Sequence, residues 1–391
     1  MDKKIGHNST WFVKILGAAL LALIMLAVSC CSRPEGPAAT GRPETTVDGG
    51  NTDATPAEEQ TAEPPATQVP LETTEYSFRD NADRFKIYGR YDTVNAGVTC
   101  DWSAGGFSVN AYCRGDVILN AQNSAGSTFF TVFIDGEQLE APVLASKKTV
   151  IASGLGEGLH TIEVFRQTEV RQGRLVLKSL TLDGILLDPP AASPLNLIFI
   201  GDSISSGFGL NPKTVSGAED HVDATRAYPF LTARALGADF EIIAVIGIGL
   251  VKGYVTETMG QVFPYIDSYR SVKNKYAAAR GADAVIINLG TNDATMSSNA
   301  AAFKTALKEL VAAVRETYGE NVPIIWIYNS MRADHSKYTR EAVEELQAEG
   351  INIAAVKFTA DSSAYGHPGI DAHKKDTEQL LELLKTQYGI G

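Results

Sequence analysis

The residue with the clearest chemical potential is Ser203, which directly follows a short apolar run. The run LNLIFI over 195–200 continues as Gly201-Asp202-Ser203 and then enters a glycine-rich turn over 205–209. An apolar run of this length that ends at glycine predicts a buried strand of a parallel sheet. A side chain just past the carboxyl end of such a strand lies where open α/β sheets bind ligands. Ser203 is therefore a candidate nucleophile.

A serine of this kind needs a base, and histidine is the usual one. Of the six histidines in the chain, His367 is the best candidate. It follows the last predicted strand, on the same edge of the sheet as the serine, and Pro368 restricts the chain after it. His373 is expected inside the final helix, where it packs or caps. His221 and His335 are expected in solvated loops.

Acyl transfer also needs hydrogen-bond donors for the developing oxyanion. Asn292, in the phrase GTND after the third predicted strand, offers a side-chain N–H. Gly247, in the phrase IGIG after the second strand, offers a backbone N–H that can approach a ligand closely. The backbone N–H of Ser203 is the third candidate donor. Each phrase alone is common in turns. Together they are informative, because they follow strands whose carboxyl ends lie at one edge of the sheet.

Regular alternation of strands and helices after residue 195 predicts an α/β domain with a parallel sheet. The predicted strands are 195–200, 240–245, 284–289, 324–328 and 351–356. The predicted helices are 228–236, 267–280, 300–318, 338–349 and 371–388.

Residues 76–189 have a different pattern, with many short alternating strands and no helical period. Strands are expected at 85–88, 107–112, 128–134, 160–165 and 175–182. Asp135-Gly136 predicts a hairpin turn, and Asp183-Gly184 is expected to close the last strand. The pattern predicts a β-sandwich domain ahead of the α/β domain at 195–391.

These four phrases, in this order, resemble the SGNH, or GDSL, hydrolase superfamily, whose blocks would be Ser203, Gly247, Asn292 and His367. Further phrases are similar to carbohydrate esterase family 2, over roughly residues 76–391. They are Ala227–Pro229, IGIG, GTND, His367-Pro368 with His373, Gly158–His160 and Arg166–Glu169.

The resemblance implies a flavodoxin-like hydrolase domain preceded by a small jelly-roll domain. It also implies an exported esterase that works without a metal or other cofactor. Its substrate would be an acetylated polysaccharide such as xylan or glucomannan. Two alternatives remain open: a non-catalytic glycan-binding surface lipoprotein, and an esterase acting on peptidoglycan O-acetyl groups or short acyl lipids. Aromatic residues that could stack on sugar, or lie in the core, are Tyr254, Trp326, Tyr328 and Tyr365.

One position departs from the superfamily pattern. The acid that usually stands three residues before the catalytic histidine is replaced by Ala364, and the nearest upstream acid is Asp361. An orienting acid normally fixes the tautomer of the imidazole. We therefore expect either a Ser203–His367 dyad oriented by a backbone carbonyl or Asp361 turned toward the ring. Asp371 is expected to cap the last helix instead.

A metal interpretation of His367, Asp371 and His373 is disfavoured. Pro368 and Gly369 separate His367 from the helix that carries the other two residues. Asp371 and His373, two positions apart, point to different sides of that helix.

The N-terminal sequence predicts an export signal rather than part of a folded domain. Lysines precede an apolar run of about 15 residues, a length typical of a signal peptide. Small residues before Cys30 resemble a lipoprotein lipobox, so a signal is expected over 1–30 with lipid on Cys30. Plain secretion and an uncleaved anchor are the alternatives. Residues 31–75, rich in Pro, Thr and Glu, predict a disordered linker.

Two further inferences concern cysteine and charge. Cys100 and Cys113 flank an expected hairpin turn, so either a disulfide or two buried thiols is expected there. The formal charge of −12 argues against nucleic acid as a partner and against electrostatic capture on anionic lipid. We expect a monomer in the bacterial cell envelope, held at the membrane only by its lipid.

Overall fold

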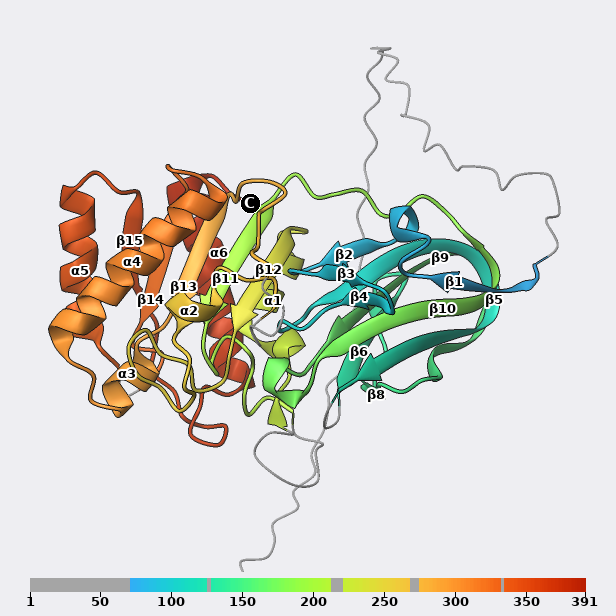
Figure 1. The fold of residues 1–391 in the computed structure, drawn as a ribbon, viewed down its shortest axis with the longest axis horizontal. Coiled ribbons are helices and arrows are strands. Elements are labelled where there is room, and N and C mark those ends of the chain that lie inside the picture. Colours follow the sequence, from blue (N-terminus) through green and yellow to red (C-terminus); the bar gives the residue numbers. More distant parts are fainter. Residues whose placement is uncertain (1–70, 125–127, 212–220, 268–273, 332–333) are drawn as a thin grey trace, which may run out of the picture. The chain divides into compact units, whose positions relative to one another are not determined.

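The computed structural model describes residues 71–124, 128–211, 221–267, 274–331 and 334–391 (Figure 1). These residues belong to one unit, Thr67–Gly391. The predicted signal peptide over 1–30, its Cys30 and residues 31–70 of the predicted linker over 31–75 lie outside the described residues. None of the helices within the described ranges is long and apolar enough to cross a membrane.

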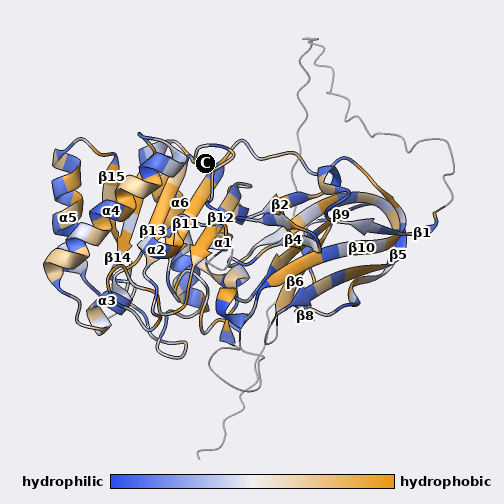
Figure 2. Ribbon diagram, in the orientation of Figure 1, coloured by the Kyte–Doolittle hydropathy of each residue, from blue (hydrophilic) through white to orange (hydrophobic). Residues whose placement is uncertain are grey.

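Five parallel strands form the sheet that carries the candidate site. They are β11 (Asn196–Gly201), β12 (Asp239–Ala244), β13 (Ala284–Asn288), β14 (Ile324–Tyr328) and β15 (Ile353–Lys357). Their order in space is β12-β11-β13-β14-β15, which is the flavodoxin-like order. The strands are strongly apolar in Figure 2 because helices cover both faces of the sheet. The predicted α/β architecture is confirmed.

Helices pack on the two faces of this sheet. They are α1 (Tyr228–Ala235), α2 (Met259–Val262), α3 (Thr291–Thr295), α4 (Ala300–Tyr318), α5 (Ser336–Ala348) and α6 (Ile370–Tyr388). Buried side chains of α2, α4 and α5 share one core cluster with the sheet. Those of α1 and α6 share the other.

The helix predicted over 267–280 is wrong for its described part, residues 274–280, which is irregular. Its alanines favour a helix by propensity, but tertiary contacts override a weak preference. The backbone N–H of Tyr276 donates to the carbonyl of Pro264 instead, and the Tyr276 hydroxyl donates to Glu241.

An antiparallel β domain precedes the parallel sheet, as predicted. Its main path runs β3-β4-β10-β5-β9-β6-β7, with β1, β2 and β8 paired onto β10, β5 and β6. The long strands β5, β9 and β10 curve around one end of this domain in Figure 1, and bulges interrupt the β5–β9 and β5–β10 ladders. The strands are β1 (Thr73–Ser77), β2 (Lys86–Tyr88), β3 (Asp92–Val94), β4 (Gly97–Thr99), β5 (Gly106–Asn123), β6 (Phe129–Ile134), β7 (Glu137–Gln138), β8 (Val143–Leu144), β9 (Thr149–Arg166) and β10 (Leu175–Leu186).

Three local features of the β domain bear on the sequence predictions. Asp135 and Gly136 form the predicted hairpin turn between β6 and β7, both with positive φ. Asp183-Gly184 does not close β10, which continues to Leu186. A Cβ at Gly184 would lie 2.2 Å from the carbonyl oxygen of Tyr112, so this glycine permits close strand approach rather than a turn. Strand β1 begins at Thr73, inside the predicted linker, because Thr73–Ser77 pair with β10.

The structure contradicts the disulfide between Cys100 and Cys113, because both are buried free thiols. Strands β4 and β5 do not form a hairpin, since β10 lies between them. Cys100 bonds to Leu175 at one end of β10, whereas Cys113 pairs with Gly184. Nine residues of strand span about 30 Å, far beyond the roughly 7 Å limit between the Cα atoms of a disulfide.

Candidate active site

Ser203 lies in the turn that follows β11, in a largely buried position that leaves it 5% exposed. The Asp202 side chain accepts the backbone N–H of Ile204 at 3.0 Å, and the Asp202 carbonyl accepts the N–H of Ser206 at 3.1 Å. The turn therefore fixes the backbone on both sides of the serine. It holds the hydroxyl at the carboxyl edge of the sheet.

His367 lies in the loop after β15 and contacts this hydroxyl. Ala364 and His367 exchange two backbone hydrogen bonds of 2.9 Å around a two-residue turn. Both turn residues, Tyr365 and Gly366, have positive φ, as a tight turn of the primed type requires. The turn places His367 Nε2 2.8 Å from Ser203 Oγ.

The second ring nitrogen of His367 faces a backbone carbonyl, not an acid. Its Nδ1 lies 3.4 Å from the carbonyl oxygen of Tyr365, which can only accept a hydrogen bond. An N–H at Nδ1 leaves Nε2 as the acceptor for the serine hydroxyl. Burial lowers the pKa of His367, and the carbonyl of Tyr365 acts in the opposite direction. The ring is thus neutral and able to accept a proton at neutral pH.

Asp361, the alternative orienting acid, is occupied elsewhere. Its Oδ2 accepts from the Ser363 hydroxyl at 2.6 Å, from the Ser363 N–H at 3.2 Å and from the Gly369 N–H at 2.8 Å. These hydrogen bonds lower the pKa of Asp361. The carboxylate therefore ties together the two ends of the 361–369 loop that presents His367, rather than bonding to its ring.

Asn292 joins the turn of the serine to the turn of the glycine. Its Nδ2 donates to the Ile248 carbonyl at 2.8 Å and, over a longer 3.2 Å, to Asp202 Oδ2. It lies at the start of α3 and is 6% exposed. Gly247 has a φ of 80°, a conformation that favours glycine. The three turns after β11, β12 and β13 therefore meet at this point, as the sequence predicted.

A neighbouring carboxylate fixes the loop after Gly247. Asp293 accepts the backbone N–H groups of Leu250, Val251 and Lys252 at 2.8 to 3.0 Å. Asp293 is fully buried. Sequence reasoning assigned it no role because its partners are backbone atoms, which carry no residue-type signal.

The other three histidines of the α/β domain have partners of their own. His373 is buried on α6, and its Nδ1 accepts the N–H of Tyr228, so it anchors α6 to α1. His335 bonds to the Ser298 hydroxyl at 2.9 Å. His221 is not simply solvated: it stacks on Tyr365, with ring centroids 4.1 Å apart. His367 and His373 thus have different hydrogen-bond partners.

The aromatic candidates for sugar contact divide into two groups. Trp326 is buried in the sheet, so it belongs to the core, and Tyr328 is half-buried at the end of β14. Tyr254 and Tyr365 are 66% and 63% exposed. Tyr254 adjoins Gly247 through a 2.7 Å backbone hydrogen bond, and Tyr365 is two residues from His367. Two exposed rings therefore belong to the loops that carry the candidate site.

An aromatic ring that the sequence did not single out packs on the histidine. Phe208, in the glycine-rich turn after the serine, has its ring centroid 4.5 Å from that of His367. It supplies part of the apolar contact around the imidazole. Its position after Ser203 was the available signal, but an aromatic residue in a turn has no specific meaning by itself.

A serine hydrogen-bonded to a histidine at the carboxyl edge of a parallel sheet is the arrangement expected of a serine hydrolase. Two family models match the chain: the GDSL-like Lipase/Acylhydrolase family over residues 199–380 and the Carbohydrate esterase 2 N-terminal domain over residues 87–190. Together they cover both folded domains. The chain therefore contains a GDSL-like hydrolase domain preceded by a carbohydrate esterase 2 N-terminal domain.

Proteins similar to this chain are named as esterases. Cellulase/esterase CelE of Acetivibrio thermocellus is 30% identical over 327 residues, which are 77% of this chain and 39% of that protein. The chain thus spans about two fifths of that relative. An acetylxylan esterase / glucomannan deacetylase of Cellvibrio japonicus is 22% identical over 75% of this chain and 86% of that protein.

A solved structure supports the same assignment. A family two carbohydrate esterase from Clostridium thermocellum, in complex with cellohexaose, superposes with a TM-score of 0.72. It is 28% identical and matches 78% of this chain and 100% of that one. The order of the two domains is therefore that of a family 2 esterase.

Proposed function

We propose that this protein is an exported serine esterase that removes O-acetyl groups from a polysaccharide. Ser203 Oγ attacks the acetyl carbonyl while His367 Nε2 accepts the hydroxyl proton. The tetrahedral intermediate then collapses, and His367 returns that proton to the departing sugar oxygen. Water, deprotonated by the same nitrogen, attacks the acetyl-serine, and the proton returns to Ser203 as acetate leaves.

The oxyanion of each tetrahedral intermediate is held by three N–H groups. They are the backbone N–H groups of Ser203 and Gly247 and the side-chain N–H of Asn292. Asn292 supplies the hydrogen that now makes its longer contact, the 3.2 Å one to Asp202. Donors held in place before the reaction cost no reorganisation when charge develops.

One observation carries the proposal: the 2.8 Å contact between Ser203 Oγ and His367 Nε2. It joins residues 164 positions apart, and the tautomer set by the Tyr365 carbonyl is the one a general base needs. The reaction runs on a dyad, with Asp361 acting on the loop and not on the ring.

The first test compares Ser203→Ala with the wild-type protein on 4-nitrophenyl acetate. We expect the variant to release 4-nitrophenol at the rate of the uncatalysed solution, while its melting temperature stays close to that of the wild type. A rate in Ser203→Ala equal to that of the wild type would refute the assignment of the nucleophile. Loss of activity in a misfolded variant is detected by the melting temperature.

The substrate proposed is an acetylated xylan or glucomannan. The names of the relatives and the two exposed tyrosines support it, since aromatic rings stack on sugar faces. Acetate release is measured in parallel from acetylated xylan, acetylated glucomannan, O-acetylated peptidoglycan and a short acyl lipid, with Ser203→Ala as the blank. Faster release from the last two would replace the substrate but keep the chemistry. A folded protein without release from any of them would favour a glycan-binding lipoprotein.

We further propose that the protein is a monomeric lipoprotein of the bacterial cell envelope, or its secreted equivalent. Its lipid would be carried by Cys30. The apolar run before this cysteine and the Pro- and Thr-rich segment after it support this location. Such a segment would hold the esterase away from the membrane, within reach of polymeric substrate.

A further inference from the structure

A segment of the β domain contacts the loop that carries Gly247. The Arg166–Gly173 segment begins at the last residue of β9 and contains the short helix η2 (Val170–Gln172). Sequence comparison marked Arg166–Glu169 as a family-like phrase, but the proposed reaction uses none of these residues.

Buried hydrogen bonds hold the Arg166–Gly173 segment in place. Arg166 is fully buried and donates to the carbonyls of Asp101, Glu169 and Gly173 at 2.6 to 2.9 Å. A buried guanidinium with backbone acceptors on several sides is costly to displace. The loop that it braces is therefore rigid relative to the β domain.

This braced segment binds the peptide unit between Ile246 and Gly247. Arg171 Nη1 donates to the Ile246 carbonyl at 3.3 Å. Burial raises the pKa of Glu169 to about 7, and the charge of Arg171 acts in the opposite direction. The Ile246 carbonyl is thus bound by a side chain of the other domain.

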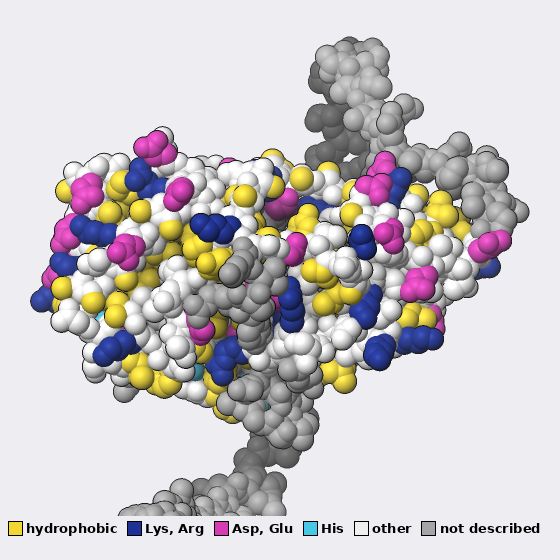
Figure 3. Space-filling view, viewed as in Figure 1, with side chains coloured by type: hydrophobic (Ala, Val, Ile, Leu, Met, Phe, Trp, Pro, Cys, Tyr) yellow, Lys and Arg dark blue, Asp and Glu magenta, His cyan; other side chains and the backbone are white. Residues whose placement is uncertain are grey.

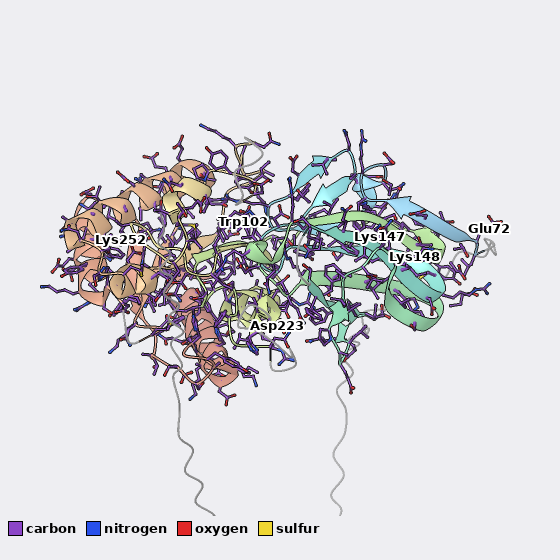
Figure 4. All side chains as sticks on the ribbon, turned by 60° about the horizontal axis from the view of Figure 1, so that its bottom comes forward. Glu72, Trp102, Lys147, Lys148, Asp223 and Lys252 are labelled. Carbon is purple, nitrogen blue, oxygen red and sulfur yellow. The ribbon has the colours of Figure 1, made fainter. Side chains whose placement is uncertain are left out.

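Apolar contacts support the same junction. Val170 and Trp102 of the β domain belong to the hydrolase core cluster that includes Val245 and Ile248. Trp102, labelled with Asp223 in Figure 4, lies where the β domain meets the α/β domain, and its indole N–H donates to the Ile266 carbonyl at 2.6 Å. The β domain therefore packs directly under the loop that follows β12.

The segment also reaches the turn of the serine. The Gln167 carbonyl accepts the N–H of Ala224 at 2.8 Å, and the preceding residue, Asp223, donates its N–H to Gly207 at 3.0 Å. Gly207 lies in the glycine-rich turn after Ser203. One segment of the β domain is thereby connected to the loops of both the nucleophile and the oxyanion donor.

We propose that Arg171 is a positioning residue of the oxyanion hole, through which the β domain orients the Gly247 N–H. This rests on the proposed function, in which that N–H binds the oxyanion. The peptide between Ile246 and Gly247 is planar and trans, so its C=O and N–H point in opposite directions. Arg171 binds this C=O, and this fixes the direction of the Gly247 N–H. The positive charge on the carbonyl also strengthens that N–H as a donor.

Arg171→Met is the variant that tests this, because Arg171 is exposed and its loss leaves the core intact. Removal of an oxyanion donor costs about 100- to 1000-fold in kcat, so loss of its support should cost about 10-fold. We expect kcat for 4-nitrophenyl acetate to fall about 10-fold in Arg171→Met, with KM changed less than about 2-fold. Arg171→Lys, which keeps a cationic donor, should recover part of the rate.

Two further measurements distinguish a positioning role of Arg171 from a role in holding the two domains together. The rate at which a serine-directed phosphonate labels Ser203 should fall in parallel with kcat, because the phosphonyl oxygen occupies the same hole. The pH midpoint of kcat/KM, set by His367, should not move.

Arg174→Met is the matched control. Arg174 pairs with Asp101 and Asp267 at the same junction but makes no contact with Ile246 among the described residues. Its loss should lower the melting temperature and leave kcat within about 2-fold. Wild-type kcat in Arg171→Met, or an equal fall in both variants, would overturn the inference. Activity that persists in Ser203→Ala would instead refute the proposed function itself, so the two failures are distinguishable.

Discussion

Replacing Asp361 by alanine and by asparagine distinguishes a loop-holding carboxylate from an orienting acid. One oxygen of Asp361 accepts three hydrogen bonds, two from Ser363 and one from Gly369. Each contributes about 0.5 to 1 kcal/mol when partly exposed, so Asp361→Ala removes about 2 kcal/mol from the loop. At 1.36 kcal/mol for each factor of ten, this sets a limit of about 30-fold on the loss of kcat/KM.

Asp361→Asn behaves differently if the loop account is correct. The amide oxygen of asparagine accepts the same three hydrogen bonds, so kcat/KM should fall less than about 3-fold. The assay is initial-rate hydrolysis of 4-nitrophenyl acetate from pH 5 to 9, with the melting temperature of each variant measured alongside. An orienting acid replaced by its amide typically costs about 10⁴-fold in kcat. A loss of that size in Asp361→Asn would refute the dyad.

Three further outcomes follow from the structure. Burial and the charge of Asp361 raise the pKa of Asp376 to about 7, so its folded form holds a proton more tightly than the unfolded chain, where the pKa is about 4. Stability is therefore lost as the pH rises from about 4 to 7, and the melting temperature of Asp376→Asn should exceed that of the wild type by more at pH 8 than at pH 5; a constant difference would refute this. Tyr254→Ala should raise KM for acetylated xylan about 5- to 10-fold, as expected for a stacking contact of about 1 kcal/mol, without changing KM for 4-nitrophenyl acetate; equal KM values for xylan would refute the stacking. Cys30→Ser should move the protein from the membrane to the soluble fraction and abolish labelling by a fatty acid analogue, whereas membrane retention without lipid would show an uncleaved anchor.

The surface charge agrees with a neutral substrate. Lys and Arg side chains lie interspersed with Asp and Glu over the face shown in Figure 3. With a formal charge of −12 over the sequence, the protein has no electrostatic reason to bind a polyanion.

The α/β half of the fold was predictable because each strand is a short apolar run bounded by turn residues. Strand 324–328 was predicted at its observed limits, and the helix 300–318 likewise. The helix expected at 267–280 failed because Tyr276 and its neighbours bond to groups distant in sequence. Propensity does not report such contacts.

The proximity of Ser203 and His367 was predictable for a topological reason. Parallel strands bring their carboxyl ends to one edge, so phrases at strand ends meet there. The sequence left two alternatives behind His367 Nδ1, a backbone carbonyl and Asp361. It could not identify the carbonyl as that of Tyr365, because every residue carries such a group. The contact of Arg171 with Ile246 was hidden for a similar reason, since it joins a side chain of one domain to the backbone of the other.

The failed disulfide shows the limit of local reasoning about strands. Cys100 and Cys113 are close in sequence and flank a turn, which predicted two facing strands. The chain instead inserts β10 between β4 and β5. Pairing order of this kind depends on the whole β domain, not on the 14 residues from Cys100 to Cys113.

The measurement that tests the central claim most directly is the mass of the folded protein after exposure to a serine-directed phosphonate. The account predicts a single adduct on the peptide containing Ser203, none in Ser203→Ala, and much slower labelling in His367→Ala. A folded wild-type protein that acquires no adduct, or one labelled equally fast in Ser203→Ala, would contradict the proposal that Ser203 is a nucleophile activated by His367.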